Sequence, residues 1–214
     1  MTKQIDTIET TLAQPQRVKK FDPYSKYASS SDIQTSLLVE DWVCELVEPK
    51  DPALHTSANI DPFGKDIDWA TREQEMFALM TESVGIGLAS PQIGSSYNMF
   101  VMNHSHLGNI GVYKPEIVEY GEETYNNEEG CLTFPLLYLH IKRSKEIKVK
   151  YWKGDGETQV EVKMDGRDAI VFQHEYDHLQ GDLFIDKVSE FKLKRAFNKR
   201  EKVLKKLGRT FGHE

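Results

Sequence analysis

Two histidines four residues apart, with a glutamate directly after the first, form the group of residues with the clearest chemistry in this chain. In a helix, His174 and His178 would project from one face, where both imidazoles can bind the same metal ion. Glu175 would lie about 100° further round the helix, within reach of a water on that metal but not itself a ligand. The spacing therefore predicts a metal-dependent hydrolase.

The residues around this motif indicate a buried helix. Ile170, Val171 and Phe172 precede the motif, and Leu179 follows it. The same spacing also arises on solvated helices without any common function, but the apolar neighbours favour burial. Buried histidines and a buried glutamate need polar partners. A metal ion with its water would supply partners for all three.

A catalytic metal site of this kind needs a further protein ligand, because such sites combine three protein ligands with an open position. A histidine six residues after the second is excluded, since Phe184 stands there. Glu190 and Glu201 are candidates, although both lie in a lysine-rich segment in which we expect surface ion pairs. The other candidate is Cys131, which follows Gly130 in an expected turn where the backbone can approach closely.

Composition places the expected enzyme in a class and a compartment. The 214 residues suffice for one well-buried domain. Its two cysteines give no disulfide framework, Cys44 is expected to be a small buried strand residue, and a thiolate ligand favours a reducing compartment. No run of 18 apolar residues exists, and Asp6 and Glu9 argue against an organellar transit peptide. We therefore expect a cytoplasmic protein.

Three segments of the chain closely resemble, in the right order, the three signature motifs of peptide deformylases. They are GIGLASPQ at Gly85–Gln92, EGCLT at Glu129–Thr133 and QHEYDHL at Gln173–Leu179. The similarity runs from about Leu46 to about Leu207. It implies an enzyme that removes the formyl group from the N-formylmethionine of nascent polypeptides and releases formate.

The resemblance also implies a role for individual residues. Cys131, His174 and His178 would hold the metal, which is Fe²⁺ in the family, while Zn²⁺, Ni²⁺ or Co²⁺ can substitute. Glu175 would take a proton from the attacking water and return it to the leaving amine. The side-chain amide of Gln92 and the backbone N–H of Leu132 would stabilise the oxyanion.

Substrate contacts follow from the same resemblance. Ile86, Ile170 and Val171 resemble the methionine pocket of the family, and Gly87 would let an extended peptide pair with the loop edge. Glu129 and Gly130 would contact the substrate side of the site. Glu129 would also pair with a supporting arginine, Arg143. The chain departs from the usual motifs at Ser90, Thr133 and Tyr138, which puts peptide affinity in doubt before chemistry.

The rest of the sequence predicts the elements that position this site. Residues 1–40 lack apolar periodicity and read as a tail or a loosely docked arm, while residues 41–214 form the catalytic domain. Residues 42–49 are expected to form a short strand, and Asp68 to cap a helix whose apolar face carries Met76, Phe77, Met80 and Ser83. Further strands are expected near residues 97–102 and 112–120.

A hairpin and the metal helix follow. In the hairpin, alternating apolar residues face one another across a turn at residues 154–156: Ile147, Val149 and Tyr151 against Val160, Val162 and Met164. Asp165 and Asp168 are expected to form a capping box at the start of the metal helix, and Gly181 to end it. These elements predict an α+β fold, with a buried metal-binding helix packed against mixed or antiparallel sheets.

The C-terminal segment is predicted to be a basic amphipathic helix at about residues 187–209. Ten Lys or Arg side chains stand there against Glu190 and Glu201, a net charge of +8 in a chain of −7. Leu193, Phe197, Leu204 and Leu207 recur on one apolar face. The charge suits a simple solvated face or, as the resemblance implies, contact with ribosomal RNA. Without Trp, the helix is not expected to bind membranes stably.

Two alternatives from other classes remain open on sequence alone. The chain could be a zincin-like metallopeptidase with Glu201 as its third ligand, or an inactive ribosome-binding module that holds metal without turnover.

Overall fold

The computed structural model describes residues 43–65 and 67–208. Its α-helices are α1 (Trp69–Glu82), α2 (Gly166–Gln180) and α3 (Glu190–Lys206). Its strands are β1 (Gly87–Ala89), β2 (Met99–His104), β3 (Gly108–Tyr120), β4 (Thr124–Gly130), β5 (Tyr138–Ser144), β6 (Glu146–Trp152) and β7 (Gln159–Asp165). Short 3-10 helices are η1 (Pro52–His55), η2 (Ser90–Ile93) and η3 (Phe184–Lys187). The predicted tail at 1–40, Trp42 and Arg209 lie outside the described residues.

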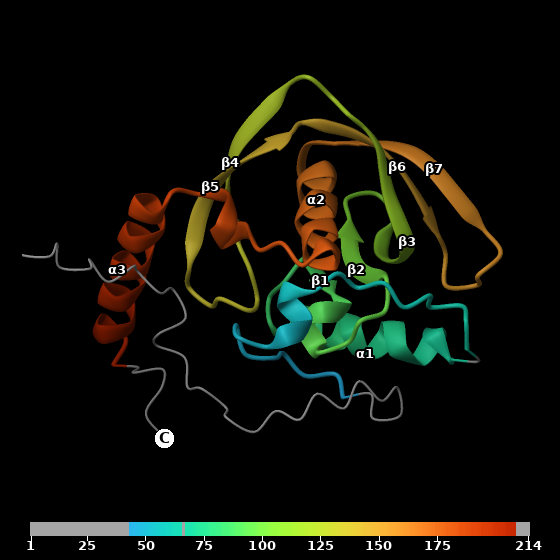
Figure 1. Cartoon of the computed structure of the whole chain (residues 1–214), viewed down its shortest axis with the longest axis horizontal. Coiled ribbons are helices and arrows are strands. Elements are labelled where there is room, and N and C mark those ends of the chain that lie inside the picture. The colour runs from blue at the N-terminus through green and yellow to red at the C-terminus, as the bar shows by residue number, and fades with distance from the viewer. Residues whose placement is uncertain (1–42, 66, 209–214) are drawn as a thin grey trace, which may run out of the picture.

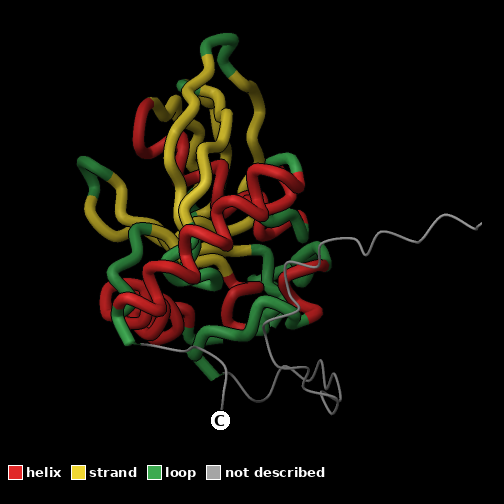
Figure 2. Tube along the Cα trace, turned by 90° about the vertical axis from the view of Figure 1, so that its left-hand side faces the viewer, coloured by secondary structure: helices red, strands yellow, loops and turns green. Residues whose placement is uncertain are grey.

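The strands form two antiparallel sheets around α2. One sheet has the order β1-β2-β3-β6-β7, and β4 pairs with β5 in the other. Figure 1 shows α2 in the centre beneath the arching strands, with α1 below and α3 beside β5. From the side of α3, a helix crosses in front of the long strands, which extend above it (Figure 2). The predicted α+β class, with a buried helix against antiparallel strands, is confirmed.

Strand β2 carries side chains to both helices that cover it. Phe100 and Met102 belong to the apolar cluster that includes Phe172 of α2, whereas Met99 and Val101 pack with the cluster of α1. Successive residues of a strand point to opposite faces, so this alternation buries both sides of β2. The metal helix is therefore held by a strand that is itself fixed from behind.

Several local predictions are confirmed. Asp68 accepts a hydrogen bond from the Thr71 N–H at the start of α1, and Met76 and Met80 are buried. The hairpin of β6 and β7 has the expected register: Ile147 lies opposite Met164, Val149 opposite Val162 and Tyr151 opposite Val160.

The strand predicted at residues 42–49 is wrong. Residues 43–49 form no strand, and of the hydrogen bonds expected in a ladder only the bond from the Val47 N–H to the Gln92 carbonyl is present. The alternation has another cause, because Leu46 packs on the cluster of α1 and Val47 on that of α3. Consecutive residues thus enter two different cores. Cys44 is half-buried in this irregular segment instead of a strand.

The capping box predicted for α2 is also wrong. Asp165 occupies the N-cap position but makes no side-chain capping bond. The Asp168 carboxylate instead accepts hydrogen bonds from the N–H and hydroxyl of Ser105, in the turn between β2 and β3. At the other end Gly181 has φ 78°, the left-handed C-cap that was predicted.

The C-terminal helix docks by its apolar face. Leu193 and Phe197 pack with residues of β5 and η3, and Leu204 is buried, but Leu207 is 57% exposed and lies outside this face. Arg200 is not a surface charge, because it is buried and its Nε donates to the Pro135 carbonyl at 2.7 Å. Among the described residues, no helix is both long and apolar enough to cross a membrane.

Replacement of Gly181 by alanine should destabilise the fold through backbone crowding. A Cβ there would lie 3.0 Å from backbone atoms of His55 and Thr56, in addition to the left-handed strain. Gly108→Ala is a matched control, because Gly108 has φ 73° and an open space around it. We expect Gly108→Ala to cost about 1 kcal/mol and Gly181→Ala clearly more, measured by urea unfolding. Equal losses would contradict the crowding.

Candidate metal centre and active site

One cysteine directly after β4 and two histidines of α2 lie close together. Ligand atoms of Cys131, His174 and His178 all lie within 4.8 Å of one another. The Cys131 Sγ is 3.3 Å from the His178 Nε2. Within the described part of the chain, neither Glu190 nor Glu201 belongs to such a cluster. The geometry thus favours Cys131 over these glutamates as the third ligand.

The turn after β4 places Cys131 next to the histidines of α2. The Phe134 N–H donates to the Cys131 carbonyl, which closes a tight turn directly after Gly130. Gly130 lies opposite Tyr138 in the ladder, and a Cβ on it would be 3.0 Å from the Tyr138 ring. The absent side chain therefore lets the tyrosine ring lie over the strand end beside the cysteine.

A buried carboxylate orients the first histidine. The Glu129 Oε2 lies 2.9 Å from the His174 Nδ1, and both Glu129 oxygens accept hydrogen bonds from Arg143, at 2.7 and 2.9 Å. The structure thus pairs Glu129 with Arg143, as the resemblance implied. With Nδ1 engaged by Glu129, the other ring nitrogen of His174 is left for a metal.

Sequence reasoning missed two further members of this charged group. Arg143 Nη1 also donates to the Asp177 Oδ2 at 2.6 Å, and Lys187 Nζ lies 3.1 Å from the Asp177 Oδ1. Asp177 lies inside the metal-binding motif, so its position was visible, but its partners come from β5 and η3. A local sequence pattern does not predict contacts between segments so far apart in the chain.

Gln92 has its amide fixed by three contacts. Its Oε1 accepts from the Ala89 N–H at 2.9 Å, which directs Nε2 toward Cys131 Sγ at 3.4 Å and Thr133 Oγ1 at 3.2 Å. The threonine at position 133 thus supplies the hydroxyl that a serine would supply. At another departure from the usual motifs, the Ser90 hydroxyl donates to the Tyr97 carbonyl.

Glu175 is buried and lacks a partner for one oxygen. Its Oε2 makes no hydrogen bond among the described residues. A Cβ on Gly87 would lie 2.2 Å from its Oε1, so only glycine leaves room for this carboxylate. Burial raises the pKa of Glu175 to about 7, against the opposing charges of His174 and Arg143. An unpartnered buried oxygen of this kind fits a site that receives a water molecule.

Without a metal, the surroundings shift the pKa values of the two histidines in opposite directions. Burial opposes protonation of His174, but its hydrogen bonds with Cys131 and Glu129 raise its pKa to about 10. Burial, together with the positive charges of His174 and Arg143, holds the pKa of His178 well below its usual value. A metal ion would replace the His174 proton, because imidazole ligands bind as the neutral base.

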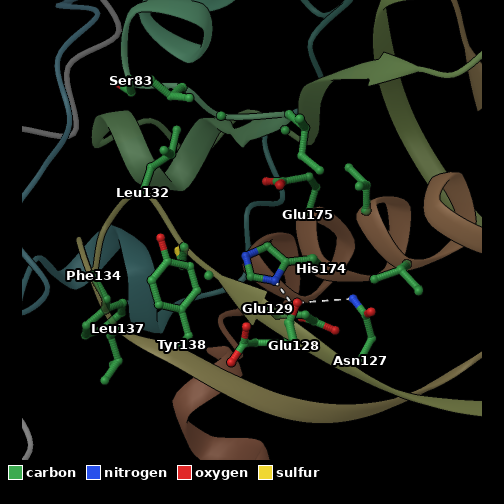
Figure 3. A pocket seen from close by; sticks show the side chains of 18 of the residues that line it. Ser83, Asn127, Glu128, Glu129, Leu132, Phe134, Leu137, Tyr138, His174 and Glu175 are labelled. Carbon is green, nitrogen blue, oxygen red and sulfur yellow. Dashed lines mark hydrogen bonds and ion pairs between the residues drawn. The ribbon is translucent and has the colours of Figure 1, made fainter. Parts of the chain in front are cut away.

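A pocket of about 970 Å³ opens in front of this cluster. It is lined on one side by Ile86, Gly87 and the edge of β1, and on the other by Glu129 and Gly130 of β4. Ile170 and Val171 of α2, one turn before the first histidine and the glutamate, also line it. In Figure 3 the side chains of His174 and Glu175 point into the pocket, across from Leu132 and Tyr138.

The donor set fits a divalent transition metal. One thiol sulfur and two imidazoles are the ligands that zinc and iron accept in proteins, and here they converge in a buried site. The free Glu175 oxygen beside them needs a polar partner that a water on the metal would provide. Both the ligand types and the burial of these residues therefore fit a metal cofactor.

The sequence pattern described as polypeptide deformylase matches residues 43–194, more than half of the chain. The chain belongs to the polypeptide deformylase family. The Thermotoga maritima peptide deformylase is 48% identical over 119 residues, 56% of this chain and 71% of that protein. The Aquifex aeolicus peptide deformylase is 34% identical over 165 residues, 75% of this chain and 95% of that one.

A solved structure supports the same family. The crystal structure of the peptide deformylase from Thermotoga maritima matches with a TM-score of 0.63 at 42% sequence identity, over 68% of this chain and 97% of that chain. The protein is therefore an enzyme of the deformylase family, and the three resembling motifs are found together around one metal centre.

Gly87→Ala should slow deformylation without emptying the metal site. The new Cβ would displace the Glu175 carboxylate, whose Oε1 would otherwise lie 2.2 Å from it. Loss of a positioned acid–base group typically costs a factor of about 10²–10⁴ in rate. We expect kcat for formate release to fall by about 100-fold with unchanged metal content.

Gly64→Ala is the control for this substitution, because a Cβ at Gly64 meets its nearest atom at an ordinary 3.4 Å. A normal kcat in Gly87→Ala would show that Glu175 can act from another position.

Proposed function

We propose that the pocket before Cys131, His174 and His178 is where this enzyme removes the formyl group from the N-formylmethionine of nascent polypeptides and releases formate. The observation that carries the assignment is the meeting of a Cys/His/His donor set with a buried carboxylate oxygen that has no partner. The products are formate and a free α-amine.

Cys131, His174 and His178 would hold the metal. A bound divalent ion lowers the pKa of water and polarises the formyl carbonyl. Fe²⁺ is proposed as the metal in the cell, with Zn²⁺, Ni²⁺ or Co²⁺ as possible substitutes, because this donor set accepts all four and availability decides between them.

Glu175 is proposed as the acid–base group. Its Oε2 would accept a proton from the attacking water and later donate that proton to the departing α-amine. Gly87 lies directly against the carboxylate and would limit its movement between the two transfers. Its burial keeps bulk water from competing for the proton.

Gln92 and Leu132 are proposed to stabilise the oxyanion that forms at the formyl carbon. The Gln92 Nε2 already faces the cluster, and its Oε1 is held by the Ala89 N–H, so the amide is oriented before substrate binds. The Leu132 backbone N–H follows Cys131 directly in the chain. Removal of one such donor from an oxyanion site typically costs about 3–4 kcal/mol.

The substrate is proposed to bind as an extended strand between two sheet edges. β1 ends the five-stranded sheet, β4 pairs only with β5 within its sheet, and the pocket lies between them. Gly87 on β1 and Glu129 and Gly130 on β4 would border the peptide, which could pair with the β1 edge. Ile86, Ile170 and Val171 would form the apolar pocket for the methionine side chain.

The zincin-like alternative loses its basis. Its third ligand was to be Glu201, which belongs to no metal-binding cluster in the described residues, and the family match points to deformylation. An inactive binding module would have no need of a confined, unpartnered carboxylate beside the metal ligands, and this supports an active enzyme.

Glu175→Gln should strongly reduce turnover while the metal stays bound. Glutamine keeps the size of the side chain but cannot take up the proton from water. With protein prepared anaerobically with Fe²⁺ or with Ni²⁺, we expect formate release from a formyl-Met-Ala-Ser peptide to fall at least about 100-fold.

Cys131→Ala separates the metal from the base in the same assay. It should lose both metal and turnover, whereas Glu175→Gln loses turnover alone. Full metal retention in Cys131→Ala would contradict the ligand assignment, and formate release by Glu175→Gln at the parent rate would contradict the proposed base.

The exposed basic side of α3 is proposed to contact ribosomal RNA, which would place the enzyme near emerging chains. Its apolar face is already occupied by β5 and η3, whereas its exposed lysines are available to a partner. They are Lys192, Lys194, Lys199, Lys202, Lys205 and Lys206. Phosphate contacts by such side chains give binding that weakens steeply with salt.

Replacement of Lys199, Lys205 and Lys206 by glutamine should weaken cosedimentation with ribosomes and flatten its salt dependence, while turnover of a short peptide is kept. Arg200 is left in place because its buried guanidinium holds α3 to the Pro135 carbonyl. Replacement of Lys148, Lys150 and Lys163 on β6 and β7 removes the same charge elsewhere. Equal losses in both triple variants would indicate a general charge effect and refute the α3 contact.

The cellular location and domain limits follow from this proposal. We propose a cytoplasmic location, because the proposed substrates are chains still attached to ribosomes in that compartment. Residues 41–214 are taken as the catalytic domain, since the family match begins at residue 43.

A further inference from the structure

Alternating charges form a continuous chain from the surface to the first histidine of the metal centre. Lys187 Nζ lies 3.1 Å from Asp177 Oδ1, and Asp177 Oδ2 lies 2.6 Å from Arg143 Nη1. Arg143 binds Glu129 through Nε and Nη2, and Glu129 Oε2 lies 2.9 Å from His174 Nδ1. The five residues come from η3, α2, β5 and β4.

Burial increases along this chain toward the metal ligands. The exposed fraction of the side chain is 30% for Lys187 and 18% for Asp177, but only 5% for Arg143 and 4% for Glu129. Charge pairs in such a dry environment hold a fixed geometry more firmly than surface pairs, and loss of one partner is strongly felt. A change at the exposed Lys187 can therefore affect the buried pair of Arg143 and Glu129.

The two charged side chains in the middle of this row, Asp177 and Arg143, each pair with a charged group on either side. Asp177 offers one oxygen to Lys187 and the other to Arg143. Arg143 gives one edge of its planar guanidinium to Glu129 and its remaining Nη1 to Asp177. Without Asp177 the guanidinium would be held on one edge only, and the Glu129 carboxylate could tilt with it.

We propose that Asp177 and Lys187 are positioning residues for His174, acting through Arg143 and Glu129. The carboxylate at Nδ1 sets the tautomer and the ring plane of a metal-binding histidine. Asp177 fixes that carboxylate by fixing Arg143, and Lys187 holds Asp177 from the outer side. This inference rests on the proposed role of His174 as a ligand.

The test measures how tightly the metal is held, independently of deformylation. The parent protein and the variants Asp177→Asn and Lys187→Met are loaded with Co²⁺. The absorption spectrum is recorded, and the rate of Co²⁺ transfer to excess chelator is measured. We expect Asp177→Asn to release Co²⁺ about tenfold faster with altered absorption bands. Lys187→Met should show a smaller increase in the release rate. Lys187→Arg, which keeps the positive charge, should release Co²⁺ at the parent rate.

Two controls separate positioning from general stability. Asp182→Asn removes a second ion-pair partner of Lys187, at 3.8 Å, and Lys163→Met removes an exposed 3.0 Å ion pair with Glu146 that does not belong to this network. Both should release Co²⁺ at the parent rate. If Asp177→Asn and Lys187→Met lower the unfolding temperature but leave the release rate and spectrum unchanged, the two residues only stabilise the fold and the inference is overturned.

The double variant tests the order of the chain. If Lys187 acts through Asp177, Asp177→Asn with Lys187→Met should release Co²⁺ no faster than Asp177→Asn alone. Multiplied effects would overturn this route. Lys187 is partly exposed, so Lys187→Met gives a measurement even where Asp177→Asn fails to fold. A parent protein without a cysteine-to-Co²⁺ band would overturn the proposed ligand set, and with it this inference.

Discussion

The metal centre depends on one buried carboxylate, that of Glu129, which joins the small β4–β5 sheet to α2. It accepts two hydrogen bonds from Arg143 and lies 2.9 Å from the imidazole of His174. Cys131 stands two residues further along the same strand end. One strand end therefore sets two proposed ligands: Cys131 by its place in the chain, and His174 through the hydrogen bond to its ring. The four-residue spacing on α2 then places His178.

The two glutamates of the site show how surroundings separate identical groups. Burial opposes the charge of Glu129, but the bonds to His174 and Arg143 outweigh it and lower its pKa. Glu175 is buried as well, yet one of its oxygens has no partner, and burial raises its pKa. One carboxylate is thereby fixed as a structural anion, while the other can exchange a proton. Such divergence between neighbouring acids is typical of active sites.

Much of the site was visible in the sequence because its chemistry is local. The spacing of His174 and His178, the glycine before Cys131 and the alternation in the β6–β7 hairpin each act over a few residues, and each predicted the right structure. The polar strand β4 was missed, because its sequence TYNNEEG has no apolar alternation and most of its side chains are exposed. Asp177 and Lys187 were missed for a related reason, since tertiary partners determine their roles. Residues 42–49 misled because two separate cores imitate the period of a strand.

The position of the pocket between the edges of β1 and β4 bears on when a substrate can be processed. In the proposed binding mode, a site between two strand edges admits a chain only while that chain is extended, and an N-terminus already packed into a helix or a sheet would not enter. Synthesis adds about 5–20 residues per second, and domains fold as units while they emerge. Deformylation thus competes with the folding of each client, and proteins whose first strand or helix is buried early leave the enzyme the shortest time. With this binding mode, the folding rate of a substrate would help to determine whether its N-terminal methionine ever loses the formyl group.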